Sequence, residues 1–92
     1  MNLAIELGEG FTDDDVVVLV DGKEAWRRSG VTTNYSVGLA AIAAISAAPG
    51  TTVEVRVRGM SRTERVEHAP LRTFIDPDGL LSIIEAPGGS VF

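Results

Sequence analysis

Residues 16–28 read VVVLVDGKEAWRR, and this stretch decides the fold class of the chain. Its first five residues are apolar and mostly β-branched, which is typical of a strand covered on both faces. The Asp21-Gly22 pair suits a two-residue type I′ turn, because both turn positions need a positive φ. The sequence therefore predicts a β-hairpin. In a regular hairpin, three pairs of residues face one another: Val20 and Lys23, Val18 and Ala25, and Val17 and Trp26.

The returning strand of this hairpin, residues 23–28, carries charge on both faces apart from Ala25 and Trp26. Lysine and arginine side chains are typical of a strand at the edge of a sheet, where they discourage unwanted pairing. We therefore expect this strand to be exposed at an edge. An exposed edge strand can still take up a strand of another protein.

Alternating apolar and polar residues continue on both sides of the hairpin. Residues 3–7 and 53–57 place apolar side chains at every second position, which predicts half-buried strands. The tetrapeptide Asp76-Pro77-Asp78-Gly79 fits a type I turn with a glycine bulge, and it joins two further strands at 71–75 and 80–84. This spacing of short strands and turns is typical of an all-β domain.

The chain as a whole predicts a single antiparallel β-sandwich of about seven to eight short strands over residues 1–86, with a flexible tail at 87–92. A turn is expected at 59–62, followed by a polar strand at 63–68. The expected core is drawn from alternating apolar positions or their neighbours, because the inward side of each short strand stays open: Leu3, Ile5, Leu7, Val17, Leu19, Val53, Val55, Val57, Phe74, Leu81 and Ile83.

Residues 39–48 fit two structures. Alanine favours a helix, and Leu39, Ile42 and Ile45 would lie on one helical face. As a strand, Ile42 and Ile45 would point to opposite sides, which is acceptable only if both sides are covered. The neighbouring strands favour a strand slightly, and a short helix at 39–48 stays the alternative.

The chain has 92 residues, 45% of them apolar, and a formal net charge of −5. This length leaves room for one small core, and the acid excess argues against a surface that neutralises nucleic-acid phosphates. The absence of cysteine excludes disulfides and thiolate metal sites. The first ten residues do not resemble a secretory signal, and no apolar run is long enough to span a bilayer. We expect a cytoplasmic protein that binds neither nucleic acid nor a membrane.

Catalytic chemistry has little support in the sequence. His68 is the only histidine and Glu67 stands beside it, but no nucleophile elbow of the G-x-S-x-G type is present. A zinc site of the His/Cys type cannot be built from one histidine and no cysteine. The sequence therefore predicts that the chain is not an enzyme and has no cofactor, with Ca²⁺ as the one open possibility.

An acidic segment before the apolar strand could hold that cation. Carboxylate oxygens are the ligands that Ca²⁺ takes in proteins. The candidate ligands are four acids in one stretch: Glu9, Asp13, Asp14 and Asp15. The alternative role for these acids is solubility and protection of the adjoining apolar strand from aggregation.

Two pairs of residues are candidates for binding a small ligand. Arg58 and Arg62 lie around the expected turn at 59–62 and could bind a carboxylate or phosphate, because arginine presents a planar fork of donors. Trp26 and Tyr35 could form a small aromatic patch beside the polar loop 29–38. The alternative for Trp26 is a structural role in the hairpin.

The stretches VVVLVDGKEAW at 16–26 and APGTTVEVRVRG at 48–59, with VTT between them, are similar to the small β-modules of the PEGA and carboxypeptidase-regulatory type. In those modules an apolar strand runs into a D-G-K turn, and a proline–glycine turn later leads into a strand of alternating valines. The resemblance implies a non-enzymatic accessory or adhesive module, and it assigns no functional residues.

Two functional hypotheses follow. The first is a non-catalytic β-sandwich that acts through contact with a protein partner or with a second copy of itself. The second is a domain that binds a small ligand, or a carbohydrate in the presence of Ca²⁺. The first is favoured because the sequence lacks a catalytic set and contains an exposed strand at 23–28.

Overall fold

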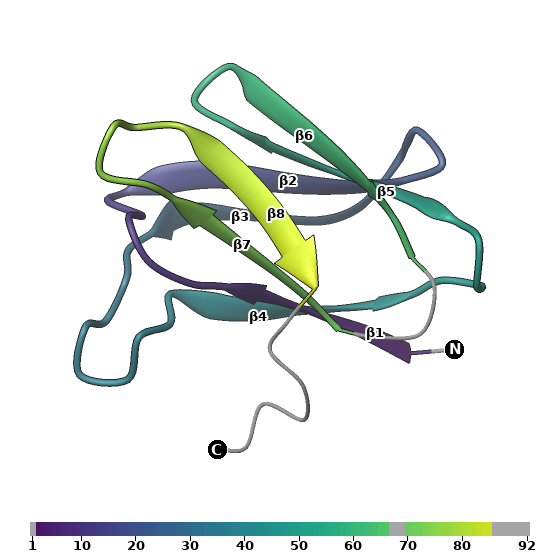
Figure 1. Cartoon of the computed structure of the whole chain (residues 1–92), viewed down its shortest axis with the longest axis horizontal. Coiled ribbons are helices and arrows are strands. Elements are labelled where there is room, and N and C mark those ends of the chain that lie inside the picture. The colour runs from purple at the N-terminus through teal and green to yellow at the C-terminus, as the bar shows by residue number, and fades with distance from the viewer. Residues whose placement is uncertain (1, 67–69, 86–92) are drawn as a thin grey trace.

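The computed structural model describes residues 2–66 and 70–85, which form a β-sandwich of two four-stranded sheets (Figure 1). Sheet A has the order β4-β1-β7-β8, and sheet B has the order β3-β2-β5-β6. The strands of sheet A are β1 (Asn2–Leu7), β4 (Ala41–Ser46), β7 (Leu71–Ile75) and β8 (Leu81–Glu85). The strands of sheet B are β2 (Asp14–Val20), β3 (Lys23–Val31), β5 (Thr52–Val57) and β6 (Met60–Arg65). The predicted sandwich of seven to eight short strands is confirmed.

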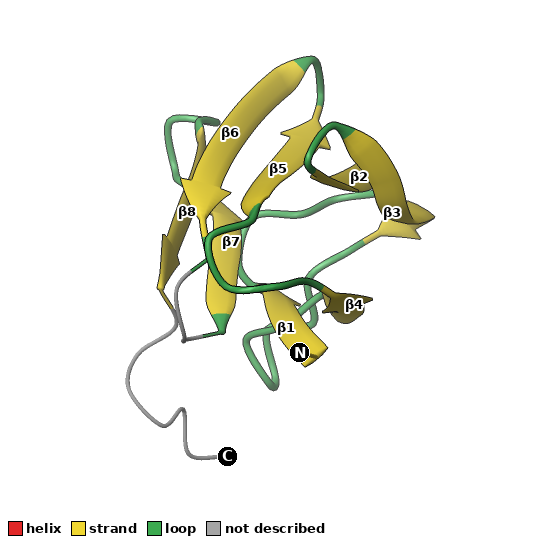
Figure 2. Cartoon of the chain, turned by 90° about the vertical axis from the view of Figure 1, so that its right-hand side faces the viewer, coloured by secondary structure: helices red, strands yellow, loops and turns green. Residues whose placement is uncertain are grey.

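The two sheets face each other and approach at both sides of the sandwich. Strand β3 lies next to β4, and β6 lies next to β8 (Figure 2). The space between the sheets is filled by apolar side chains from every second position of the central strands. The buried cluster comprises Leu3, Ile5, Leu7, Phe11, Val16, Val18, Val31, Ala43, Ile45, Ala47, Val53, Val55, Val57, Val66, Leu71, Ile75 and Leu81.

The hairpin at 16–28 forms as predicted at its turn and differs farther along. Asp21 and Gly22 have φ values of 50° and 83°, as a type I′ turn requires. Val20 pairs with Lys23, as expected, but a register shift follows and leaves Ala25 as the extra residue of a bulge. The two other expected pairs are therefore wrong. The pairs found are Leu19 with Glu24, Val18 with Trp26, and Val17 with Arg27.

The expected core was partly wrong, because in two strands the side that faces inward differs from the expected one. In β2, Val16 and Val18 face the core, whereas Val17 and Leu19 point to the outer face of sheet B, where Leu19 is nonetheless buried. In β7, Phe74 is half-buried on the outer side. A run of apolar residues has no polar alternation to show which side faces inward, so its parity cannot be read from the sequence.

Three expected local structures need correction. Residues 39–48 contain strand β4, so the helical alternative is wrong. The turn expected at 59–62 is shorter: Arg58 and Gly59 alone join β5 to β6, with φ values of 53° and 77°. The region 29–38 was expected to be irregular, yet β3 continues to Val31.

The sandwich is not wholly antiparallel. Strands β1 and β7 pair in parallel, while the other strand pairs of the described residues are antiparallel. Parallel neighbours need a long connection, and here the whole of sheet B and β4 separate β1 from β7 in the chain. A local sequence pattern does not carry this information.

The last hairpin forms as predicted. Gly79 N donates to Asp76 O at 2.8 Å, Asp76 N donates to Leu80 O at 3.0 Å, and Gly79 has a φ of 84°. These contacts are those of a type I turn followed by a glycine bulge. The expectations for His68 and for the tail at 87–92 lie outside the described residues. The described part of the chain has no helix that is long and apolar enough to cross a membrane.

Candidate functional site

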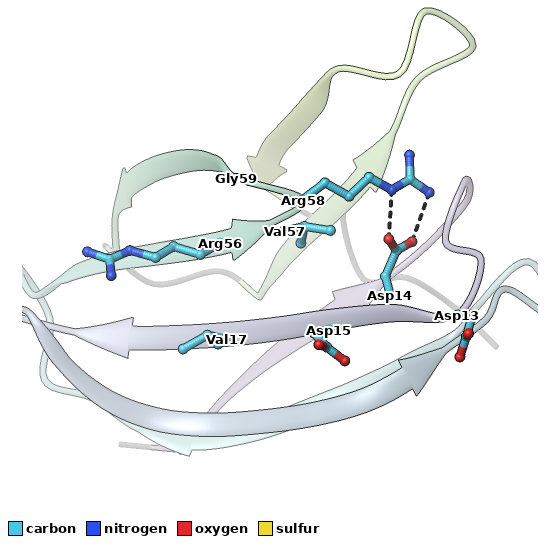
Figure 3. Close-up of a pocket in the computed structure, with 8 residues that line it drawn as sticks. All are labelled: Asp13, Asp14, Asp15, Val17, Arg56, Val57, Arg58 and Gly59. Atoms are coloured by element: carbon cyan, nitrogen blue, oxygen red, sulfur yellow. Dashed lines mark hydrogen bonds and ion pairs between the residues drawn. The ribbon is translucent and has the colours of Figure 1, made fainter.

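Asp14 and Arg58 form an ion pair that closes one end of the sandwich. Asp14 begins β2 with its side chain buried, and Arg58 reaches it from the β5–β6 turn (Figure 3). Arg58 Nε donates to Asp14 Oδ1 at 2.6 Å, and Nη2 donates to Oδ2 at 2.9 Å. The backbone N–H of Thr12 donates to the same carboxylate at 2.8 Å. The pair therefore ties the loop before β2 to the neighbouring strand turn.

The charges of this pair stabilise each other. Burial alone would raise the pKa of the Asp14 carboxyl, but the hydrogen bonds from Arg58 and Thr12 and the Arg58 charge outweigh burial and lower that pKa below its usual value. The hydrogen bonds to Asp14 likewise raise the pKa of Arg58. Arg58 also donates from Nη2 to Gly10 O at 3.2 Å. Its guanidinium thus acts as a structural clamp, which holds the loop at 8–13 between β1 and β2.

A hollow of about 480 Å³ lies beside the clamp (Figure 3). Its lining residues are Asp13, Asp14, Asp15, Val17, Arg56, Val57, Arg58 and Gly59. Arg58 is engaged by Asp14, and Arg56 Nε donates to Glu54 Oε2 at 2.6 Å. Both arginines that line the hollow are therefore already paired with carboxylates, which disfavours the predicted anion site.

The structure separates Arg62 from Arg58. Arg62 lies on β6, and its Nε donates to Leu81 O at 2.9 Å, a contact that joins the two sheets. It lines a different hollow, beside Leu80 and Leu81. The predicted pairing of Arg58 and Arg62 around one ligand is therefore not formed.

The four acidic residues proposed as metal ligands are also not brought together. Within residues 2–66 and 70–85, no group of three or more metal-ligating side chains is placed to hold an ion. Figure 3 shows the Asp14 carboxylate turned towards Arg58, with Asp13 and Asp15 pointing away from it. Glu9 lines another hollow, next to Arg72. Calcium-dependent carbohydrate binding stays a prediction from the sequence.

Trp26 and Tyr35 have different surroundings. Trp26 is half-buried against the core, with the Arg28 guanidinium 5.4 Å from its ring centroid. This agrees with a structural role in the hairpin. Tyr35 is 71% exposed, and its hydroxyl accepts a hydrogen bond from Gly10 N at 3.2 Å. No contact that we find in the described structure joins the two aromatic side chains.

The outer face of sheet A has a feature that the sequence analysis missed. Ile42 of β4 pairs with Glu6 of β1, Glu6 pairs with Arg72 of β7, and Arg72 pairs with Ile84 of β8. These four residues form one row across the whole sheet. Ile42 is 53% exposed and Ile84 is 44% exposed. In the middle of the row, Arg72 Nη2 donates to Glu6 Oε1 at 2.7 Å.

Among the side chains that the structure describes, few other polar groups lie on this face. Strand alternation places Ala4, Ala44 and Phe74 on it, together with the hydroxyl groups of Ser46 and Ser82. Among the described outward-facing residues of these four strands, Glu6 and Arg72 are the charged ones, and their charges cancel. The four strands thus present a face that is apolar at both edges and electrically neutral, and the exposed Glu9 of the loop after β1 lies beside Phe74 and Ile84.

The outer face of sheet B is of the opposite kind. Two rows cross it: Arg27, Val17, Arg56 and Ser61, and Glu24, Leu19, Glu54 and Thr63. Ion pairs join Arg27 to Glu24 at 2.8 Å and Arg56 to Glu54 at 2.6 Å. Such a charged, hydrated surface over apolar residues is common on the exposed side of an antiparallel sheet.

One signal in the sequence could have pointed to the face on sheet A. If 39–48 is a strand, Ile42 and Ile45 must point to opposite sides. Ile45 is buried in the core and Ile42 is exposed, so the condition that both be covered is not met by the residues that the structure describes. The Glu6–Arg72 pair could not be found in this way, because its two residues are far apart in the sequence and meet only through parallel pairing.

The comparison with known proteins does not add to this geometry. The segments that carry the resemblance to PEGA and carboxypeptidase-regulatory modules form the β2–β3 hairpin and strand β5, all in sheet B. The resemblance itself stays a prediction. No family model, curated protein or solved structure matches the chain.

Proposed function

We propose that this chain is a non-catalytic β-sandwich module that acts through protein–protein contact, and that the outer face of sheet A is its contact surface. The observation that carries the proposal is the pair of exposed isoleucines, Ile42 and Ile84, at the two edges of a neutral sheet face. Large exposed aliphatic side chains that share one sheet face mark a candidate interaction site. The proposal needs no metal or cofactor.

Burial of these side chains would favour association. Complete burial of an isoleucine contributes roughly 1.5–3 kcal/mol. Each of the two isoleucines is already about half-buried, so we expect about 1 kcal/mol from each on binding. Ala4, Ala44 and Phe74 would add smaller apolar areas.

The charged centre of the face does not oppose association. Glu6 is buried and hydrogen-bonded to Arg72 by two donors, at 2.7 and 3.1 Å. A carboxylate that is already withdrawn from water in the free chain loses little further hydration when a partner covers it. The ion pair can also select partners, because an approaching surface must match its orientation.

The edge strand β3, predicted as a site of strand addition, is less suitable than this face. It is at the edge of sheet B, as expected, and its side chains are mostly exposed. However, Lys23, Arg27 and Arg28 lie along it, and the bulge at Ala25 interrupts its register. Charged residues and bulges are devices that prevent edge pairing. The sequence of β4, AIAAIS, has no charge.

Site-specific photo-crosslinking in cells tests the proposal. A photoreactive amino acid replaces Ala44, which is exposed on the outer face of sheet A, and in a matched variant it replaces Thr63, which is exposed on the outer face of sheet B. We expect protein crosslinks from position 44 that are absent or much weaker from position 63. Equal crosslinking at the two positions, stronger crosslinking at 63, or none at 44 would contradict the proposal.

A further inference from the structure

We propose that a second copy of this chain covers the outer face of sheet A, in a symmetric dimer whose twofold axis runs parallel to the strands. This inference rests on the proposed function and adds the identity of the partner. It is drawn from the order of residues in the row across the sheet, which is Ile42, Glu6, Arg72 and Ile84.

The row is complementary to itself when it is reversed. The twofold axis lies in the plane between the two copies, above the gap between β1 and β7, and runs parallel to the strands. A rotation of 180° about it lays β4 of one copy over β8 of the other. Glu6 then faces Arg72 of the second copy, and Arg72 faces Glu6. Both ion pairs gain an opposite charge across the interface, and the isoleucines at the edges meet apolar surface. Closed twofold contacts of this kind are the commonest form of protein self-association.

The other face-to-face arrangement is disfavoured by charge. A twofold axis that runs along the row lays β1 over β1 and β7 over β7. Glu6 would then face Glu6 of the second copy, and Arg72 would face Arg72. Like charges opposed in a buried interface are unfavourable by several kcal/mol, so the charges select the first arrangement.

A hollow at the β8 edge offers a place for the isoleucine of the second copy. It has a volume of about 180 Å³ and is lined by Glu9, Arg72, Phe74 and Ile84. In the proposed dimer this edge lies under β4 of the second copy. Ile42, which is 53% exposed in the single chain, would then pack against Phe74 and Ile84 in this hollow, with Glu9 and Arg72 at its other sides.

The size of the face determines how strongly two copies are expected to associate. Four strands at about 4.8 Å spacing and five residues at about 3.3 Å make a face roughly 20 Å by 17 Å. This is small beside the roughly 800 Å² per partner of a typical stable complex. We therefore expect an equilibrium between monomer and dimer, which requires measurement over a range of concentrations.

Sedimentation velocity between about 10 µM and 1 mM tests the dimer. We expect the wild-type chain to move from 9.7 kDa towards twice that mass as its concentration rises. Ile42→Lys should weaken association at least tenfold. Leu80→Lys is the matched control, because Leu80 is also 53% exposed but lies in the β7–β8 turn, and it should dimerise as the wild type does. Wild-type protein that stays monomeric throughout, or equal effects of the two lysines, would overturn the inference.

A charge exchange tests whether the charged centres of two copies face each other. Glu6→Arg and Arg72→Glu should each abolish self-association, because each places two like charges in the row. Mixed in equal amounts, the two variants should associate, since every arginine would then face a glutamate. Thermal melts of both variants establish that they are folded. If either is not, Ile84→Lys takes their place, and it should weaken association as Ile42→Lys does. Folded variants that fail to associate on mixing, or an Ile84→Lys that associates normally, would contradict the proposed dimer.

The outcomes separate this inference from the proposed function. Crosslinks from position 44 to a different protein, with a wild-type chain that remains monomeric, would keep the contact surface and reject the second copy as its partner. Crosslinks from position 44 to the same chain, with a concentration-dependent mass, support both.

Discussion

Gly10→Ala should unfold the domain or lower its melting temperature by more than about 12 °C. A Cβ atom on Gly10 would lie 2.2 Å from Ile75 O and 2.6 Å from Ile75 Cβ, and Gly10 has a φ of 91°. The first contact is with backbone at the end of β7, so rotation of a flexible side chain cannot relieve it. The loop before β2 would have to move away from sheet A.

Several interactions depend on the position of this loop. Ile75 N donates to Glu9 O at 2.9 Å, Gly10 N donates to the Tyr35 hydroxyl, and Arg58 donates to Gly10 O. The steric conflict, the backbone strain and the loss of these hydrogen bonds together should lower the free energy of unfolding by about 3 kcal/mol or more. This is a large part of the roughly 5–15 kcal/mol that stabilises a small domain.

Gly22→Ala is the control for backbone strain alone. Gly22 has a φ of 83° in the β2–β3 turn, and no atom lies within 4 Å of the position its Cβ would take. We expect a loss of only about 1–2 kcal/mol. Thermal melts followed by circular dichroism compare the two variants. Equal losses would show that the close approach of Gly10 to β7 is not important.

Asp14→Asn should remove a stabilising contribution that depends on pH. The pKa of Asp14 in the folded protein lies below its ordinary value of 3.8. The ionised carboxylate therefore stabilises the fold above that value, and the contribution is lost as the pH falls through the folded-state pKa. Near pH 7 we expect Asp14→Asn to cost about 1–3 kcal/mol, because two donors from Arg58 lose a charged acceptor. The partial exposure of Arg58 favours the lower part of this range.

Denaturation with urea at pH 7 and at a series of values below pH 4 measures this contribution. The difference between the wild type and Asp14→Asn should shrink as the pH falls. Glu54→Gln is the control, since Glu54 also pairs with an arginine and has a lowered pKa but lies on the exposed face of sheet B. It should have a smaller effect. A pH-independent difference for Asp14→Asn would show that the ionised pair with Arg58 does not stabilise the fold.

Much of the sandwich could be predicted because short-range patterns determine its hairpins. Asp21-Gly22 and the segment 76–79 specify their turns through residues that accept positive φ. The alternating valines of β5 define its buried face. The parity of β2 and the bulge at Ala25 could not be predicted, because both sides of an apolar run look alike and the bulge depends on pairing between strands.

Side chains that are distant in sequence account for the errors about the candidate site. Arg58 was a reasonable ligand for an anion, but its guanidinium is already hydrogen-bonded to Asp14, which lies 44 residues earlier in the sequence. Glu6 and Arg72 are separated by 66 residues and meet because β1 and β7 are parallel neighbours. A local pattern identifies such residues as charged and exposed. Only the order of strands in the sheet shows which charges meet and which apolar residues remain uncovered.

The proposed dimer joins two copies of the chain through the outer face of sheet A. A dilution series of backbone amide NMR spectra, from about 1 mM to about 20 µM, tests it most directly. We predict that concentration-dependent shifts are confined to β4, β1, β7 and β8, and are largest around Ile42 and Ile84. Spectra that do not change with concentration, or shifts that gather on β3 and the other strands of sheet B, would contradict it.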